Sequence, residues 1–394
     1  MKGSRSSLWR VARHAAAGLA VLVLLPYAWA PVYRFPEPAP FAGSHLWNPY
    51  AATTGNWLRA NLHAHGHAWL GLTSGAQSDA EVANRYRSLG YDVAGVSDYQ
   101  RIAAHHGIDT LPLYEHGFNL GKNHQLAIDA HAVDWFDLPL WQSPSQQQYV
   151  IDRVKRKAGL VALNHPSSRE AYGLETLRML TGFDLIEVAN GPFTTEDEWD
   201  AALSSGRLVW ALGSDDTHDL DDVRRTGVAW TMIDAASPSS ADVVSALRAG
   251  RSYAAVRTGA LGAAAITTLS TLSLEDSTIT VALSGAASTV TFIGQNGITR
   301  HSVHDAKTAS YAMTAADSYI RTVVTSPQTT LYLNPVVRWN GTALPAPVAT
   351  VNQLWTWTQR GGAAVVGCTL LLVLKRAKRS AVPSDVQRVA TERA

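Results

Sequence analysis

The sequence predicts an α/β barrel followed by a small all-β sandwich, with an apolar segment near each end of the chain. Short apolar runs alternate with amphipathic stretches over residues 55–260, as they do in α/β domains. Residues 261–347 instead hold runs rich in Thr, Val and Ile between Gly, Asn, Asp and Pro turns, which is typical of a sandwich. Uncharged apolar runs at residues 15–30 and 361–374 flank these regions.

Length and composition fit this division. The chain has 394 residues, of which 46% are hydrophobic and 16% charged, enough for one large domain and a smaller one. The ordinary apolar content excludes disordered and fibrous classes. The single cysteine, Cys368, excludes a disulfide framework and a cysteine-based zinc cluster.

The net charge of +1 is the sum of two basic ends and an acidic region between them. Of the 33 basic residues, four precede His14 and six follow residue 374, whereas only two of the 32 acidic residues lie in these ends. The region between the ends is therefore acidic, which argues against a nucleic-acid-binding protein because such a protein needs a basic face. Basic ends beside apolar segments indicate a membrane instead.

Residues 1–30 are predicted to form a basic flank and a signal-anchor or transmembrane segment. Ala28-Trp29-Ala30 resembles a cleavage site, but Pro31 follows directly and should hinder processing, so we expect an uncleaved anchor. Residues 31–54 are Pro-rich and predict an extended linker.

A second transmembrane segment is predicted at residues 354–374. Trp355 and Trp357 precede its uncharged run and a basic cluster follows, as a membrane interface selects, while Arg360 can snorkel. A buried core helix is the alternative, since the uncharged run has only 14 residues. Basic residues outside both segments place the termini in the cytoplasm, with residues 375–394 as a basic cytoplasmic tail. The body is then expected on the periplasmic side of a bacterial inner membrane.

Local signals predict the helices and strands of the body. Ser78 caps a helix, Glu81 completes a capping box, and Gly90 ends the helix. Other helices are expected at residues 145–157, 174–180 and 239–249. The sandwich strands are expected at residues 263–274, 278–283, 289–293, 318–325 and 330–339.

Six apolar runs of the α/β region end in polar residues that can carry chemistry. These ends are His63-Ala64-His65, Ser97-Asp98, Glu115-His116, Asn164-His165-Pro166, Ala189-Asn190-Gly191 and residues 213–218. If the runs are parallel strands of a barrel, their ends share one face and the polar groups converge there. Converging imidazole and carboxylate groups suit zinc, manganese or iron. Taken singly, the first motif could be a solvated edge and residues 215–219 a capped helix start, but six similar ends favour metal binding.

With these motifs, the chain resembles the polymerase and histidinol phosphatase (PHP) superfamily over roughly residues 55–260. The matching series is His63-Ala64-His65, residues 93–98, Glu115, His124, Asn164-His165-Pro166 and residues 213–218, with Asn190-Gly191 and residues 250–253 also similar. The resemblance implies a distorted (β/α)7 barrel that holds two or three metals and most often hydrolyses phosphoesters. Residues 319–321 and 333–335 resemble the β-rich extension of a branch that includes carbaryl-type hydrolases, whose members are not all phosphatases.

The resemblance also implies a set of metal ligands. The first metal would be held by His63, His65 and Asp216, and the second by His124 and His165, with Glu115 bridging the two. His218 would belong to a third position. We therefore expect two divalent ions, zinc, manganese or iron, and a third only if other ligands complete its position.

The chain departs from the family at that third position. Asp98-Tyr99 replaces the usual Asp-His, and residues 73–75 stand where a Ser-Asp is expected. His67, His105 or His106 could substitute, although each is equally well explained as a surface histidine.

The predicted reaction is attack by a metal-bridging hydroxide on a phosphomonoester or diester, because two metals lower the pKa of a bridging water and clamp a phosphoryl oxygen. Asp98 is the predicted general base. Arg101, Lys122 and Arg169 follow strand ends and are candidate phosphate contacts, although a solvated rim charge is the simpler interpretation of each. The expected substrate is a small phosphoester or related molecule, not a nucleic acid.

Two other functions are compatible with the same residues. A two-metal hydrolase of carbamate, ester or amide bonds would have identical ligands, with a metal polarising a carbonyl. A non-catalytic envelope protein could bind a partner through a degenerate barrel and the sandwich, and the incomplete third position favours it. The sandwich residues do not indicate a role, and no particular protein partner is predicted.

Overall fold

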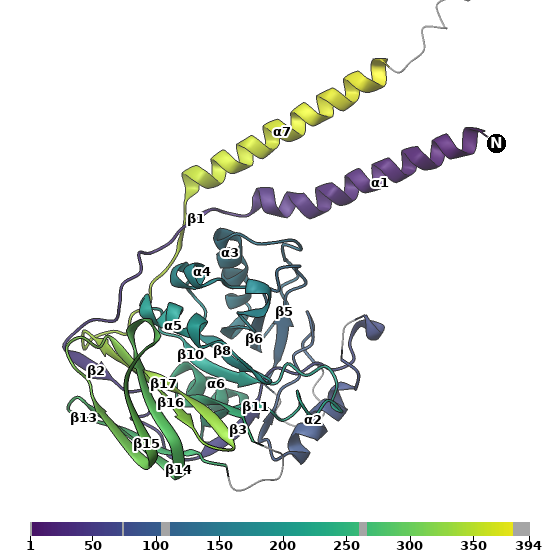
Figure 1. Cartoon of the computed structure of the whole chain (residues 1–394). Helices are drawn as coiled ribbons and strands as arrows, with labels where there is room; N and C mark the ends of the chain where they lie inside the picture. The colour runs from purple at the N-terminus through teal and green to yellow at the C-terminus, as the bar shows by residue number, and fades with distance from the viewer. Residues whose placement is uncertain (1, 73–74, 104–110, 260–265, 381–394) are drawn as a thin grey trace, which may run out of the picture. The chain divides into compact units, whose positions relative to one another are not determined.

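The computed structural model describes residues 2–72, 75–103, 111–259 and 266–380. The chain divides into two compact units, one formed by residues 1–34 with 350–394 and the other by residues 35–349 (Figure 1). The second unit is mixed α/β and contains all the predicted site residues.

The first unit consists of two long helices and a pair of short strands. Its elements are α1 (Lys2–Trp29), β1 (Tyr33–Arg34), β18 (Thr350–Val351) and α7 (Gln353–Ser380), with β1 and β18 antiparallel. The Gln359 amide donates to three carbonyl oxygens at the end of α1, at 3.1 to 3.3 Å. Arg360, predicted to snorkel, donates to the Trp29 carbonyl oxygen at 2.8 Å and lies over the Trp29 ring.

Within the described residues, Ala12–Trp29 is the one helical stretch long and apolar enough to cross a membrane. A signal sequence has the same length and composition, so α1 is compatible with either form of the predicted N-terminal segment. Residues 354–374 are helical as part of α7, and their crossing of a membrane stays a prediction. The predicted tail lies largely outside the described residues, at 381–394.

One sheet of the second unit has the order β10-β8-β7-β6-β5, with β9 paired to β8. β7, β8 and β10 are parallel, whereas β6 is antiparallel to both of its neighbours, β5 and β7. The bounds are β5 (Leu113–His116), β6 (Gln125–Ala130), β7 (Ala158–Leu163), β8 (Leu185–Asn190), β9 (Phe193–Thr194) and β10 (Trp210–Ser214).

The other sheet joins the α/β part to the β-rich part. Its order is β13-β14-β16-β17-β12-β11-β3-β4, with β15 paired to β14 and β2 to β17. The bounds are β2 (His45–Trp47), β3 (Trp57–Asn61), β4 (Val93–Ala94), β11 (Ala229–Asp234), β12 (Ser252–Arg257), β13 (Leu269–Glu275), β14 (Thr278–Gly294), β15 (Ile298–Ala312), β16 (Tyr319–Thr325) and β17 (Thr329–Trp339).

The β-rich region differs from the separate sandwich that was predicted. β17 pairs antiparallel with β12, so the sheet continues from the α/β part into this region. β14 joins the two strands predicted at 278–283 and 289–293, with a register irregularity between Ala282 and Ala287. β15 was not predicted, because polar and charged residues such as His304 and Lys307 interrupt its apolar pattern.

Two parallel bridges join the sheets around the predicted site. Ala64 pairs with Thr217, and Tyr99 pairs with Glu115. With the pairings above, these bridges make all six predicted apolar runs point in one direction. The strand β6, which was not predicted, runs in the opposite direction. Its amino end therefore lies beside the carboxyl ends of the other strands, and His124, which directly precedes β6, joins the polar residues at this edge of the sheet.

The helices of this unit are α2 (Asp79–Ser88), α3 (Pro144–Lys155), α4 (Leu174–Met179), α5 (Glu196–Ser204) and α6 (Ser240–Arg248), and its 3-10 turns are η1 (Trp69–Gly71), η2 (Ser168–Glu170) and η3 (Gln295–Gly297). The predicted capping box of Ser78 and Glu81 is confirmed at the start of α2. α5 was not predicted, although its acidic first turn suits the positive end of a helix dipole.

A buried apolar cluster fills the space between the strands. Leu62, Leu113, Leu126 and Leu212, which come from four different strand segments, are each at most 1% exposed. Burial of a leucine side chain stabilises the fold by roughly 1.5–3 kcal/mol. The strand ends that carry polar residues are therefore held at the edge of a packed core.

A buried ion pair attaches the β-rich region to α5. Arg321 of β16 is 2% exposed and donates to both carboxylate oxygens of Asp200, at 2.8 and 2.6 Å. Glu196 accepts a further bond at 2.9 Å, and the guanidinium lies over the Trp199 ring. Burial lowers the pKa of Arg321, but its bonds and charge interaction with Asp200 outweigh this and raise it.

We expect Asp200→Ala to destabilise the chain by about 3–5 kcal/mol, because it leaves the buried Arg321 guanidinium without its main partner. Urea unfolding of the detergent-solubilised chain measures this. Asp197→Ala, which removes an exposed carboxylate from the same helix, is the matched control and should change stability little. Equal effects of the two substitutions would contradict the role assigned to this ion pair.

Candidate metal centre

Four side chains from three strand ends converge at one point. His63 and His65 follow β3, Glu115 belongs to β5 and Asp216 follows β10, and one ligand atom of each lies within 4.8 Å of all the others. His65 Nε2 is 3.2 Å from both Glu115 Oε2 and Asp216 Oδ1. His63 Nε2 is 3.4 Å from Glu115 Oε2 and 3.2 Å from Asp216 Oδ1.

A second set of ligand atoms shares Glu115 with the first. His124 Nδ1 is 2.9 Å and His165 Nε2 is 3.1 Å from Glu115 Oε1, the other oxygen of that carboxylate. Glu115 therefore faces one group through Oε2 and the other through Oε1. Glu115 is thus the residue that the two groups of candidate ligand atoms share.

The spacing of these atoms fits divalent cations. Ligand atoms bound about 2.0–2.1 Å from a tetrahedral zinc lie roughly 3.3 Å from one another. The ring nitrogens of His63 and His65 face each other at 3.2 Å, and among the described residues no donor is well aligned with the buried Glu115 Oε2, although both rings lie close to it. A buried acceptor without a donor is costly, so a cation accounts for this geometry. The histidine and carboxylate set suits zinc, manganese or iron and does not distinguish among them.

The pKa shifts of the carboxylates in this cluster are also compatible with bound cations. Burial alone would raise the pKa of Glu115, but the charges of His63 and His124 outweigh it and hold that pKa well below its usual range. Burial likewise opposes ionisation of Asp216, yet the charge of His63 and the bond from His218 keep its pKa well below normal. Both carboxylates are therefore ionised at neutral pH, and protonated histidines or bound cations must balance their charge.

One residue that orients the ligands was not predicted. Glu187 of β8 accepts from His63 Nδ1 at 2.9 Å through Oε1, and from the His165 backbone N–H at 2.7 Å through Oε2. A carboxylate on the far nitrogen of a ligand histidine fixes its tautomer and turns Nε2 toward the metal. The available signal was an acid in the middle of the apolar run at residues 185–188.

Two ligands occupy unusual backbone conformations. His165 has φ +31° and Asp216 has φ +49°, in a region that non-glycine residues rarely adopt. The neighbouring Asp215 holds the turn at Asp216, because its carboxylate accepts from three backbone N–H groups and from the Tyr86 hydroxyl at 2.7 Å. Such strain persists where the surroundings determine it, which is common at functional sites.

Asp98, the predicted general base, lies outside both ligand sets. Its Oδ1 accepts from the Gly66 N–H at 2.7 Å, and its Oδ2 pairs with Arg101, which also binds Asp79. Asp98 is 1% exposed, and burial followed by the Asp79 charge raises its pKa. Both carboxylate oxygens are thus engaged in holding the loop after β3, and Arg101 is engaged with them.

The residues around His218 differ from those that the family resemblance implies for a third metal position. His218 Nε2 is 3.4 Å from Asp216 Oδ1, and its ring stacks on His65 at 4.2 Å. The Tyr99 ring stacks on His65 at 4.6 Å, where the family has a histidine. His67 is exposed, and His105 and His106 lie outside the described residues.

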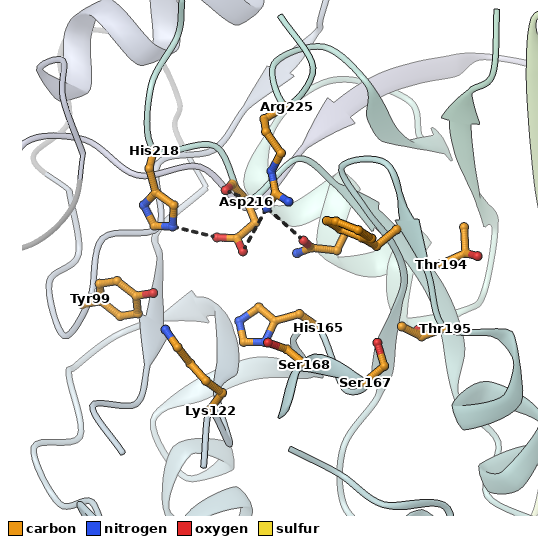
Figure 2. A pocket seen from close by; sticks show the side chains of 12 residues that line it. Tyr99, Lys122, His165, Ser167, Ser168, Thr194, Thr195, Asp216, His218 and Arg225 are labelled. Carbon is orange, nitrogen blue, oxygen red and sulfur yellow. Dashed lines mark hydrogen bonds and ion pairs between the residues drawn. The ribbon is translucent and has the colours of Figure 1, made fainter. Parts of the chain in front are cut away.

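A cavity of about 420 Å³ opens beside the ligands. In Figure 2, Lys122, His165 and Ser168 lie across the cavity from Asp216, His218 and Arg225. Of the predicted phosphate contacts, Lys122 lines this cavity, whereas Arg169 is exposed. Arg225 was not predicted. Its Nη2 is 3.6 Å from Asp216 Oδ2 and 3.3 Å from Asn190 Oδ1.

Comparisons with known proteins give limited information. No protein-family model matches the chain, and no curated protein matches it. Among solved structures, it is similar to a two-domain protein from Bacteroides vulgatus ATCC 8482 that is described as containing a predicted PHP-like metal-dependent phosphoesterase. The identity is 13%, the match covers 80% of this chain and 98% of that one, and the TM-score is 0.42. At these values the likeness does not decide the family.

We expect Glu187→Gln to weaken zinc binding about 10- to 100-fold, because the substitution removes the carboxylate that orients His63. Competition with a chromophoric chelator measures this affinity. Glu175→Gln changes a carboxylate with a side chain that is 88% exposed and serves as the control. An affinity for zinc that is the same in both variants would show that Glu187 does not support the centre.

Proposed function

We propose that this protein is a metal-dependent phosphoesterase of the PHP superfamily. The observation that carries the proposal is the shared carboxylate of Glu115, which faces two groups of buried ligand atoms through its two oxygens. Two adjacent cation positions beside a cavity are typical of phosphoester hydrolysis. The curled sheet with one reversed strand supports the distorted (β/α)7 barrel, and the β-rich region supports the branch with a C-terminal extension.

The ligand residues would hold the metals, and the cavity residues would bind the phosphoryl group. Divalent metals at these positions supply Lewis acidity that activates water and neutralises charge on phosphoryl oxygens. Lys122 and Arg225 line the cavity as cations that can bind the remaining phosphoryl oxygens. His218 also lines the cavity beside Asp216, and burial lowers its pKa, which favours the neutral imidazole that a general base needs. We therefore place His218, rather than Asp98, as the candidate base.

We expect the purified chain, loaded with manganese or zinc, to release phosphate from phosphomonoesters or diesters. The test is a panel of phosphomonoester, dinucleotide, ester and carbamate substrates, together with elemental analysis. His63→Ala with His65→Ala should reduce the metal content by about one ion per chain and abolish turnover, because both ligands belong to the first set.

Each other result of the panel has a distinct meaning. Turnover of esters or carbamates without phosphate release would favour the two-metal hydrolase of carbamate, ester or amide bonds. Less than one metal per chain, unchanged by the double substitution, would favour a non-catalytic envelope protein.

We further propose that the chain is held in the inner membrane with residues 35–349 on the periplasmic side. The apolar stretch Ala12–Trp29 supports the anchoring, and the basic residues at the outer ends of α1 and α7, beyond the apolar runs, support the orientation.

The membrane proposal predicts that the chain stays in the membrane fraction after a carbonate wash and is released by detergent. Protease added to spheroplasts should digest the body, because the body faces outward. A cytoplasmic protein serves as the control for intact cells. A chain that remains soluble, or is protected in spheroplasts, would contradict the anchoring or the orientation respectively.

A further inference from the structure

Five large apolar side chains stand exposed on neighbouring loops of the second unit. Trp69, Leu70, Phe118, Leu120 and Trp135 have exposed fractions of 41%, 101%, 53%, 51% and 61%, and we call them the rim patch. The rings of Trp69 and Trp135 meet edge to face at 5.6 Å. Exposed apolar groups that gather in this way mark an interaction surface, whereas single exposed residues need no explanation.

Backbone contacts hold the loops of the rim patch together. The Phe118 N–H donates to Asp137 Oδ2 at 2.8 Å, and the Leu120 N–H donates to the Pro139 carbonyl oxygen at 2.9 Å. These bonds fix the loop after β5 against the loop that carries Trp135. Phe118 and Leu120 are therefore exposed on a loop that is held against the Trp135 loop, and the Trp135 ring in turn contacts Trp69.

The rim patch borders the cavity of the metal centre. The Trp69 indole N–H donates to the Tyr99 carbonyl oxygen at 2.8 Å, and Tyr99 lines the cavity. Lys122, two residues after Leu120, also lines it. Phe193, which is 61% exposed, lines the cavity from β9. Anything that covers the patch therefore lies directly beside the site where a phosphoester would bind.

The charged side chains of these loops do not oppose an anionic surface. Lys122 adds a cation beside Leu120, whereas Asp134 and Asp137 in the Trp135 loop are 1% and 5% exposed. Arg153 binds the Asp134 carboxylate at 3.0 Å, which neutralises it. Apolar side chains, tryptophans and a nearby lysine are the combination that binds the interface of a membrane containing anionic lipids.

A bilayer fits this position better than a protein partner. A folded protein seated on the rim patch would obstruct the adjacent cavity, whereas a bilayer carries amphiphilic phosphoesters that can enter it. A cavity of about 420 Å³ holds a headgroup while the acyl chains stay in the membrane. We propose that the rim patch docks on a lipid bilayer and that the substrate is a phosphorylated lipid. The substrate class rests on the proposed phosphoesterase function, whereas the docking does not.

Docking is tested without any activity measurement. In a Cys368→Ser background of the full chain, which removes the exposed cysteine, Leu70→Cys and Thr308→Cys are labelled with an environment-sensitive fluorophore. The chains are reconstituted in vesicles of phosphatidylcholine and phosphatidylglycerol that contain doxyl-labelled lipid. We expect quenching at position 70 to exceed that at the exposed position 308 by at least about twofold, since only the first reaches the interface. Equal quenching at both positions would overturn the docking.

The substrate class is tested by comparing one headgroup in two forms. The full chain is assayed with vesicle-borne phosphatidic acid and with soluble glycerol 3-phosphate. Leu70→Ser with Trp135→Ser should lower turnover of the lipid about tenfold and leave that of the soluble ester within about twofold, because only the lipid is presented at the interface. Ile298→Ser, an exposed apolar residue of β15, is the control.

The outcomes separate the two proposals. Turnover of the soluble ester alone, or equal loss on both substrates, would overturn the lipid substrate while leaving the phosphoesterase in place. Phosphate release from neither substrate, nor from any member of the wider panel, would overturn the phosphoesterase function. Selective quenching at position 70 would in that case still support the docking.

Discussion

The burial of one carboxylate, that of Glu115, constrains the rest of the site. An ionised carboxylate without exposure to water costs several kcal/mol unless it is compensated. Glu115 is 0% exposed and is surrounded by four imidazoles, those of His63, His65, His124 and His165. Its backbone also carries the bridge to Tyr99 that joins the two sheets. The same residue therefore joins the sheets and both ligand sets.

The residues around the ligands serve mainly to keep them in place. Glu187 orients His63 and holds the backbone of His165, and Asp215 secures the turn that presents Asp216. Burial raises the pKa of Asp215 to about 6, against several hydrogen bonds that favour its ionised form. The carboxylates of Glu115, Glu187 and Asp216 all lie against His63, and they would repel one another in an apolar interior. The arrangement is therefore stable only with protonated histidines or bound cations nearby.

The β-rich region contributes to the site through α5. Arg321 holds Asp200 and Glu196 of that helix, and the residues just before it, Phe193 to Thr195, line the cavity. The Thr195 hydroxyl also donates to the Glu187 carbonyl oxygen at 2.7 Å. The region that sequence patterns left without a role thus supports one wall of the cavity. Its contact is a buried ion pair, which is costly to break and so keeps the wall in a defined position.

The sequence by itself determined the α/β class, the common direction of six strands and most of the residues that the structure gathers at one site, because strand ends with histidines and carboxylates form a local pattern. It also located the helices that have clear caps, such as α2. Only the tertiary structure decided that β6 is reversed, that the β-rich strands continue one sheet, and that Glu187 and Arg225 belong to the site. These features depend on pairings between distant segments, and a local pattern does not specify them. The contacts of Asp98 with Gly66 and Arg101 likewise depend on the tertiary structure, because segments distant from a carboxylate can supply its hydrogen-bond partners.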